Sequence, residues 1–108
     1  MFKPTGYSED IFKDRYAFTP EETWEQACRR VAKQVAMAEK PDKVEKYENK
    51  FYDDLVNNYF VPGGRIWDNS GRPNPQLLNC FVLNDKLDTK EGWGRLAFEN
   101  IVTSMTGG

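Results

Sequence analysis

The chain has 108 residues, an aromatic content of 14% and a formal net charge of −2 from interleaved acidic and basic side chains. The charge balance gives no reason to expect nucleic acid or a membrane surface as a partner, and the absence of a long apolar run or a signal-peptide core favours a cytoplasmic protein. The aromatic content argues against disorder, whereas two cysteines without any histidine exclude a zinc site and the commonest general base.

The N-terminal part is predicted to be an arm followed by a helix. Residues 1–18 scatter aromatic side chains among polar ones, which indicates an irregular arm lying on an apolar surface. Thr19 then suits an N-cap, Pro20 suits the first helical position, and Glu22 completes a capping box. Apolar residues recur at three- and four-residue spacing up to the next proline, so we predict a helix over 20–39.

A second helix is predicted after this proline, with Asp42 as its cap and Pro62-Gly63-Gly64 as its terminator. Its apolar stripe consists of Val44, Tyr47, Phe51, Leu55 and Tyr59. Because the link between the two helices is short, residues 19–60 are expected to form an antiparallel helical hairpin.

The remaining residues, 61–108, are predicted to hold a loop, a strand and a helix. Residues 61–76 are rich in Pro and Gly and read as a loop, with a short extended piece at Arg65-Ile66-Trp67. The apolar run 76–83 is rich in strand formers and predicts a buried strand. A lone strand cannot satisfy its own backbone, and we find no second convincing strand, so this unit is expected to be incomplete alone.

A third helix is predicted over 90–105, after a polar turn at 84–88 in which Asp88 is a candidate cap. Its apolar stripe consists of Trp93, Leu96, Ala97, Ile101, Val102 and Met105. We interpret this stripe as core or interface. The predicted fold class is therefore mainly α, with one or two short strands.

The two cysteines differ in context. Cys28 lies on the apolar stripe of the first helix, which favours a packing role. On the residues alone, Cys80 in Leu-Asn-Cys-Phe-Val is also more typical of a buried structural thiol than of a reactive one. The segment Pro62-Gly63-Gly64-Arg65 fits a tight turn better than a phosphate-binding nest.

Three local patterns occur in a fixed order along the chain. The first comprises Arg15-Tyr16, Pro20-Glu21-Glu22-Thr23 and Arg29-Arg30-Val31-Ala32. The second is Phe60-Val61-Pro62-Gly63-Gly64-Arg65-Ile66-Trp67. The third comprises Leu77-Leu78-Asn79-Cys80-Phe81-Val82-Leu83, Asp88-Thr89 and Gly107-Gly108. Together they resemble the N-terminal region of ribonucleotide reductase large, catalytic subunits, most closely the adenosylcobalamin-dependent class II.

The resemblance implies a fold and a set of roles. The predicted strand would be the first of the family's ten-stranded α/β barrel, and Cys80 would be one of two redox-active thiols, with its partner cysteine absent from this chain. Asn79 would lie near the ribonucleotide substrate, and Asp88 and Thr89 in the region that binds a deoxynucleotide effector. Implied partners are the remaining catalytic chain and a thioredoxin-type reductant, with adenosylcobalamin as the cofactor.

We therefore expect an N-terminal fragment of a ribonucleotide reductase, from a split gene or a truncation, that is not active alone. The alternative is a small helical interaction module without catalysis. That alternative accounts for the amphipathic helices and the aromatic side chains, but not for the strand around Cys80 and its flanking glycines.

Overall fold

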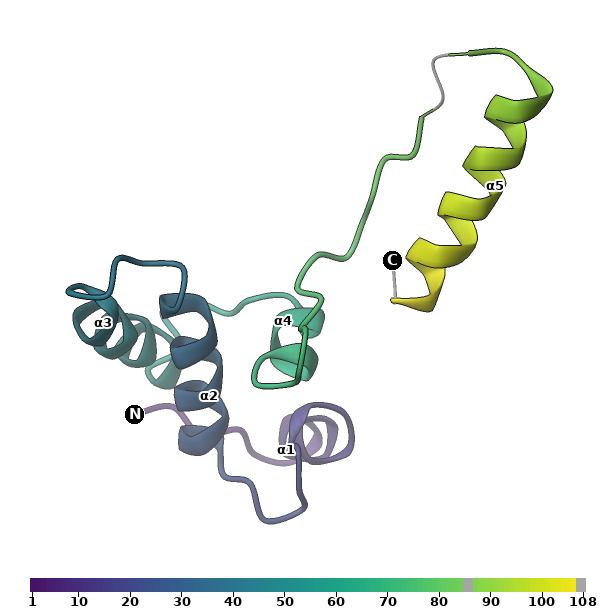
Figure 1. Cartoon of the computed structure of the whole chain (residues 1–108). Helices are drawn as coiled ribbons and strands as arrows, with labels where there is room; N and C mark the ends of the chain where they lie inside the picture. Colours follow the sequence, from purple (N-terminus) through teal and green to yellow (C-terminus); the bar gives the residue numbers. More distant parts are fainter. Residues whose placement is uncertain (85–86, 107–108) are drawn as a thin grey trace. The chain divides into compact units, whose positions relative to one another are not determined.

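The computed structural model describes residues 1–84 and 87–106. The chain divides into two compact units, which we call unit 1 (Met1–Pro75) and unit 2 (Gln76–Gly108). All regular secondary structure in the described residues is helical (Figure 1). The mainly α prediction is therefore confirmed, and each unit is described by itself below.

Unit 1 contains four α-helices and one π-helix. They are α1 (Tyr7–Ile11), the π-helix η1 (Phe12–Tyr16), α2 (Trp24–Ala36), α3 (Val44–Val56) and α4 (Gly64–Asn69). The predicted irregular arm is thus partly helical, because α1 and η1 form one continuous turn-rich segment that buries Phe12. An aromatic residue facing a core from a short helix leaves no periodic pattern, so the sequence alone did not reveal it.

The first long helix begins later than predicted. The capping box is made by Thr23 and Gln26, with Gln26 N donating to Thr23 Oγ1 at 3.2 Å and Thr23 N donating to Gln26 Oε1 at 2.8 Å. The predicted box at Thr19 and Glu22 is wrong. The Glu22 carboxylate instead accepts hydrogen bonds from other parts of the chain, which removes it from helix capping.

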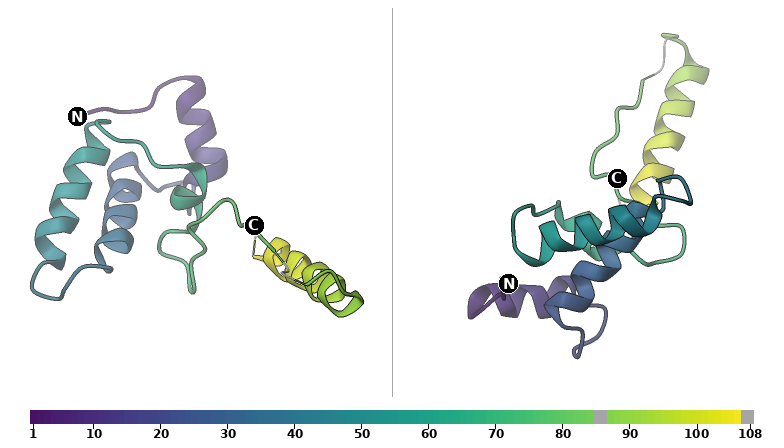
Figure 2. Two further views of the ribbon diagram at one scale, coloured as in Figure 1. Left: turned by 90° about the horizontal axis from the view of Figure 1, so that it is seen from above. Right: turned by 90° about the vertical axis from the view of Figure 1, so that its left-hand side faces the viewer.

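Helices α2 and α3 run side by side in opposite directions and form the main packed pair of unit 1 (Figure 2). The buried core that they share with η1 and α4 comprises Phe12, Ala27, Cys28, Val31, Ala32, Leu55, Val56 and Trp67. Small residues on α2 permit a close approach of the two helices. The N-cap of α3 is Lys43, which makes no side-chain capping bond, so the predicted cap Asp42 is wrong.

Helix α4 replaces the extended piece predicted at Arg65-Ile66-Trp67. Gly63 has an extended backbone, with φ −60° and ψ 155°, and serves as the N-cap. The Gly-Gly pair that we interpreted as the terminator of the preceding helix begins α4 instead, because α3 already ends at Val56 with Asn57 as its C-cap. Burial of Trp67 against α2 holds this six-residue helix in place.

Unit 2 consists of an irregular segment followed by α5 (Lys90–Met105), which confirms the helix predicted over 90–105. The strand predicted over 76–83 is not formed: residues 76–84 have no regular secondary structure. The physical reason is the one that the sequence suggested, since a strand requires a neighbour to pair its backbone groups. The described residues provide none.

One arginine connects the elements of unit 1. Arg30 donates from Nε to Glu22 Oε1 at 2.8 Å and from Nη2 to Glu22 Oε2 at 3.1 Å. Its Nη1 donates to the carbonyl oxygens of Trp67 at 2.7 Å and Ser70 at 2.8 Å, and its Nη2 to that of Tyr16 at 3.0 Å. A guanidinium has five N–H donors, so all of them are paired. The side chain joins α2 to the ends of η1 and α4.

Phe18 and Gly71 pack against the Arg30 side chain. The Phe18 ring lies 3.6 Å from the Arg30 guanidinium carbon and 4.5 Å from that of Arg72, measured to the ring centroid. Gly71 has φ +93°, and a Cβ there would lie 3.0 Å from Arg30 Cγ and Cδ. The turn after α4 therefore requires glycine both for its backbone conformation and for space beside Arg30.

We expect Arg30→Met to lower the free energy of unfolding by about 3–5 kcal/mol, because it leaves the Glu22 carboxylate, whose side chain is only 11% exposed, and several carbonyl oxygens unpaired. Urea denaturation followed by far-UV circular dichroism measures this change. The matched control is Arg15→Met: the Arg15 side chain is 72% exposed and its ion pair with Asp14 is 3.9 Å long, so the change should stay within about 0.5 kcal/mol. Equal effects of the two substitutions would contradict the role of Arg30.

Candidate functional site

The cysteine singled out by its sequence context lies on an exposed, irregular backbone. Cys80 and Asn79 are both exposed, within the segment 76–84 of unit 2. Leu78 and Val82 on either side of the thiol are 62% and 96% exposed. The interpretation of Cys80 as a buried structural thiol therefore does not hold in this chain.

The second cysteine has the opposite environment. Cys28 is fully buried in the core of unit 1, which confirms its predicted packing role. Desolvation by burial, helped by the nearby Glu25 carboxylate, raises the pKa of the Cys28 thiol to about 12. The thiolate is the reactive form, so Cys28 is inert at neutral pH. The two thiols are chemically distinct.

The two predicted effector-binding residues are engaged with the start of α5. Thr89 is the N-cap, and its Oγ1 accepts a hydrogen bond from Gly92 N at 3.0 Å. Asp88, the predicted cap, instead accepts from Trp93 Nε1 at 2.9 Å through Oδ1. Both residues are exposed, and their binding of a deoxynucleotide stays a prediction. The glycine pair Gly107-Gly108 lies outside the described residues.

The proline–glycine segment of the second pattern leads into α4, whose first residue Gly64 packs against Tyr16 of η1. A Cβ on Gly64 would lie 2.8 Å from the Tyr16 hydroxyl oxygen, so the close contact of Tyr16 with α4 depends on glycine. Helix α4 has six residues and begins without a side-chain cap. The tight turn predicted for this segment is therefore wrong, because the segment leads into α4.

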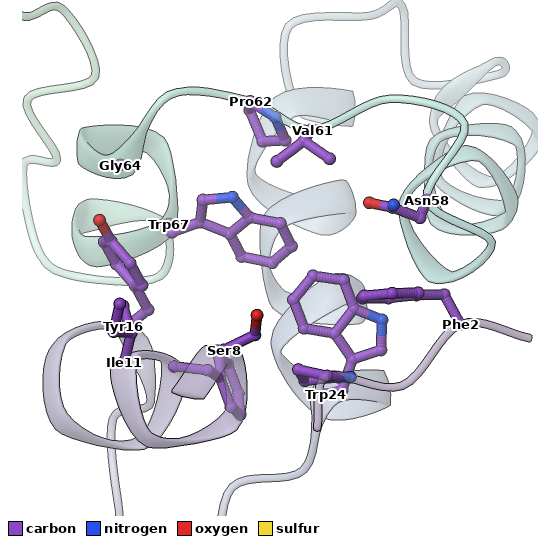
Figure 3. A pocket seen from close by; sticks show the side chains of 12 residues that line it. Phe2, Ser8, Ile11, Tyr16, Trp24, Asn58, Val61, Pro62, Gly64 and Trp67 are labelled. Carbon is purple, nitrogen blue, oxygen red and sulfur yellow. The ribbon is translucent and has the colours of Figure 1, made fainter. Parts of the chain in front are cut away.

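Unit 1 also contains an apolar cavity of about 310 Å³ that the sequence did not reveal (Figure 3). Its walls come from the N-terminal segment, α1, η1, α2, the α3–α4 connection and α4. The lining residues are Phe2, Pro4, Ser8, Ile11, Phe12, Tyr16, Trp24, Asn58, Val61, Pro62, Gly64 and Trp67. None of them carries a charged side chain.

Two indoles form the inner wall of this cavity. The ring centroids of Trp24 and Trp67 are 5.0 Å apart, and Phe2 and Phe12 each contact Trp24 edge-on at 5.7 Å. The indole Nε1 of Trp24 is buried without a hydrogen-bond partner, next to the Phe2 ring (Figure 3). An unpaired buried donor of this kind costs about 1–3 kcal/mol.

The described residues contain no candidate metal site and no candidate membrane-spanning helix. Within residues 1–84 and 87–106, no three or more His, Cys, Asp or Glu side chains come together as they would around a metal ion. The same part of the chain has no helix with the length and apolar character needed to cross a membrane.

The chain matches a known protein family. The family model described as "Ribonucleotide reductase, all-alpha domain" matches residues 2–75. This range coincides with unit 1, whose limits come from the structure. No curated protein and no solved structure matches the chain.

The contrast between the two thiols predicts their reactivity. In the folded chain, Cys80 should react with a disulfide reagent such as DTNB, whereas Cys28 should react more than about 100-fold more slowly, because a pKa of about 12 and full burial deny it the thiolate form. Absorbance of the released thiol measures both rates, and Cys80→Ser should remove the fast phase. Urea should make both thiols reactive. Two fast thiols in the folded chain would contradict this assignment.

Proposed function

The chain belongs to the ribonucleotide reductase family through its all-alpha domain, and on this premise we propose that it supplies one redox-active thiol, Cys80, to a reductase completed by the rest of the catalytic barrel. Unit 1 would be the helical N-terminal domain. Unit 2 would carry the thiol into the active site. The observation that carries the proposal is the exposure of Cys80 in a segment without regular secondary structure.

The sequence around Cys80 suits a strand that forms when a neighbour is present. In an extended backbone, alternate side chains point to opposite faces, so Leu78, Cys80 and Val82 would share one face. All three are exposed in this chain. Pairing with neighbouring strands of the barrel would satisfy the backbone and fix the thiol on a rigid element. We propose that the segment becomes the first barrel strand on assembly.

The proposed chemistry is a two-electron reduction of the ribose 2′ carbon. A thiyl radical elsewhere in the enzyme first removes the 3′ hydrogen and later returns it. Cys80 and a second thiol of the barrel then form a disulfide and provide two electrons and two protons. The C2′–O bond breaks, one proton leaves with the hydroxyl as water, and the other ends as the new hydrogen on C2′. A thioredoxin-type dithiol would reduce the disulfide again by exchange.

Helix α5 supports assembly with a larger body. At 100° per residue, the residues Trp93, Ala97, Phe98, Ile101 and Met105 lie on one side of the helix. The four large ones are 63–82% exposed, and Gly92 is the one buried residue of α5. Apolar patches of this kind mark interaction sites. We propose that this face packs against the remainder of the barrel, as the helix that follows its first strand.

The finer identity is also a proposal. We propose the class II type with adenosylcobalamin, on the resemblance of the three sequence patterns. The resemblance places none of the cofactor contacts in this chain, so they would come from the rest of the barrel. Asn79 would lie beside the ribonucleotide, and Asp88 and Thr89 would contact a deoxynucleotide effector.

The assignment of Cys80 is tested in the reductase assembled from this chain and the rest of the barrel. Cys80→Ser should reduce turnover with a thioredoxin-type reductant by at least about 10³-fold, since serine cannot form a disulfide. Binding of the ribonucleotide, measured by equilibrium dialysis, should change little. The control Cys28→Ala removes the other thiol of the chain and should retain turnover. A Cys80→Ser enzyme with normal multiple turnover would exclude the proposed role.

The docking role of α5 is tested separately from the chemistry. Phe98→Asp places a carboxylate on the apolar face, and we expect it to weaken assembly with the rest of the barrel by at least about 10-fold. Analytical ultracentrifugation measures the association. Glu99→Gln, one residue further along and on the charged side of the helix, is the matched control and should leave assembly unchanged. Equal association of the two variants would contradict docking through this face.

A further inference from the structure

We propose that the apolar cavity of unit 1 is a binding site for a small, uncharged aromatic molecule that carries one hydrogen-bonding group. The proposal is independent of the function proposed for Cys80, because every residue that it uses lies in unit 1. It rests on the volume of the cavity, the chemistry of its walls and the way in which the chain holds them.

The volume and walls fit a ring. About 310 Å³ is at the lower end of small-molecule sites, which are typically apolar with a few polar groups. Trp24 and Trp67 offer two indole surfaces, and the other aromatic lining residues are Phe2, Phe12 and Tyr16. Aromatic rings pack on such surfaces edge-on or offset. A planar ring is therefore the shape that this cavity selects.

The lining also selects against charge. No acidic or basic side chain is among the lining residues. A charged ligand would lose its hydration without gaining an opposite charge, which is unfavourable. An uncharged ligand loses much less. This absence of charge distinguishes the cavity from a site for phosphate, carboxylate or ammonium groups.

Two polar groups are placed to orient the ligand. The Ser8 hydroxyl and the Asn58 side-chain amide point into the cavity from different sides (Figure 3). Asn58 is held by the turn after α3 in the left-handed region, with φ 60°, and its N donates to Leu55 O at 3.0 Å. A hydroxyl and an amide can each donate and accept, so an amide-like group on the ligand would find partners at both.

The walls are fixed before any ligand arrives. Tyr16 lies directly on Gly64, where a Cβ would lie 2.8 Å from its hydroxyl oxygen. Trp67 is held through its carbonyl oxygen by Arg30. The π-helix η1 places both Phe12 and Tyr16 on the cavity, and π-helical turns occur frequently at functional sites. A pre-formed site loses little entropy on binding.

Titration of the full chain with benzamide, followed by the indole N–H signals in ¹H–¹⁵N NMR, tests the proposal. The signals of Trp24 and Trp67 should shift and saturate with a Kd of about 1 mM or below, while that of Trp93, in unit 2, should stay in place. Toluene lacks the polar group and should bind at least about fivefold more weakly. Benzoate carries a charge and should not bind measurably.

Variants on α1 locate the site. Ser8→Phe fills the cavity from an exposed position and should abolish the benzamide shifts. Asp10→Phe introduces the same bulk at an exposed position of the same helix outside the cavity lining, and should retain them. Both variants should keep the circular dichroism of the parent chain. Shifts that do not saturate, that include Trp93 equally, that persist in Ser8→Phe or that are as strong with benzoate would overturn the proposal.

Discussion

The five hydrogen bonds of Arg30 join α2 to the ends of η1 and α4, above the core that these elements share. A six-residue α4 and a five-residue π-helix are too short to persist on their own. Their last carbonyl groups converge on one guanidinium, which also pairs with a carboxylate from the preceding loop. The aromatic cavity depends on this arrangement, since Trp67 and Tyr16 line it while their own carbonyl oxygens accept from Arg30.

Periodic features were predictable from the sequence, and features fixed by tertiary contacts were not. The apolar spacing along α2, α3 and α5 indicated all three long helices, with errors at the starts of α2 and α3. Glu22 shows why: it has the spacing of a capping residue but serves Arg30 instead. Arg30 belongs to the first of the three sequence patterns. Its position in that pattern did not predict that it would donate to the carbonyl oxygens of Tyr16 and Ser70.

The two units differ in how their stability arises. Unit 1 has a buried core and a domain boundary that coincides with the family match. Unit 2 has one helix with a single buried residue, Gly92, and an irregular segment whose sequence favours a strand. The residues around Cys80 are typical of a strand, but a lone strand has no partner for its backbone groups. Without a neighbouring strand, the segment therefore stays irregular. Secondary structure there depends on context rather than on propensity.

The burial of Cys28 has a consequence for the redox behaviour of the isolated chain. With one thiol sealed in the core and the other on the surface, oxidation cannot join the two within a folded molecule. Under oxidising conditions, the accessible sulfur can therefore pair only with a sulfur from another molecule, giving covalent dimers or mixed disulfides. Without a reductant, the chain would thus accumulate disulfides in which Cys80 is already oxidised and can no longer supply electrons. Its helical domain would remain intact.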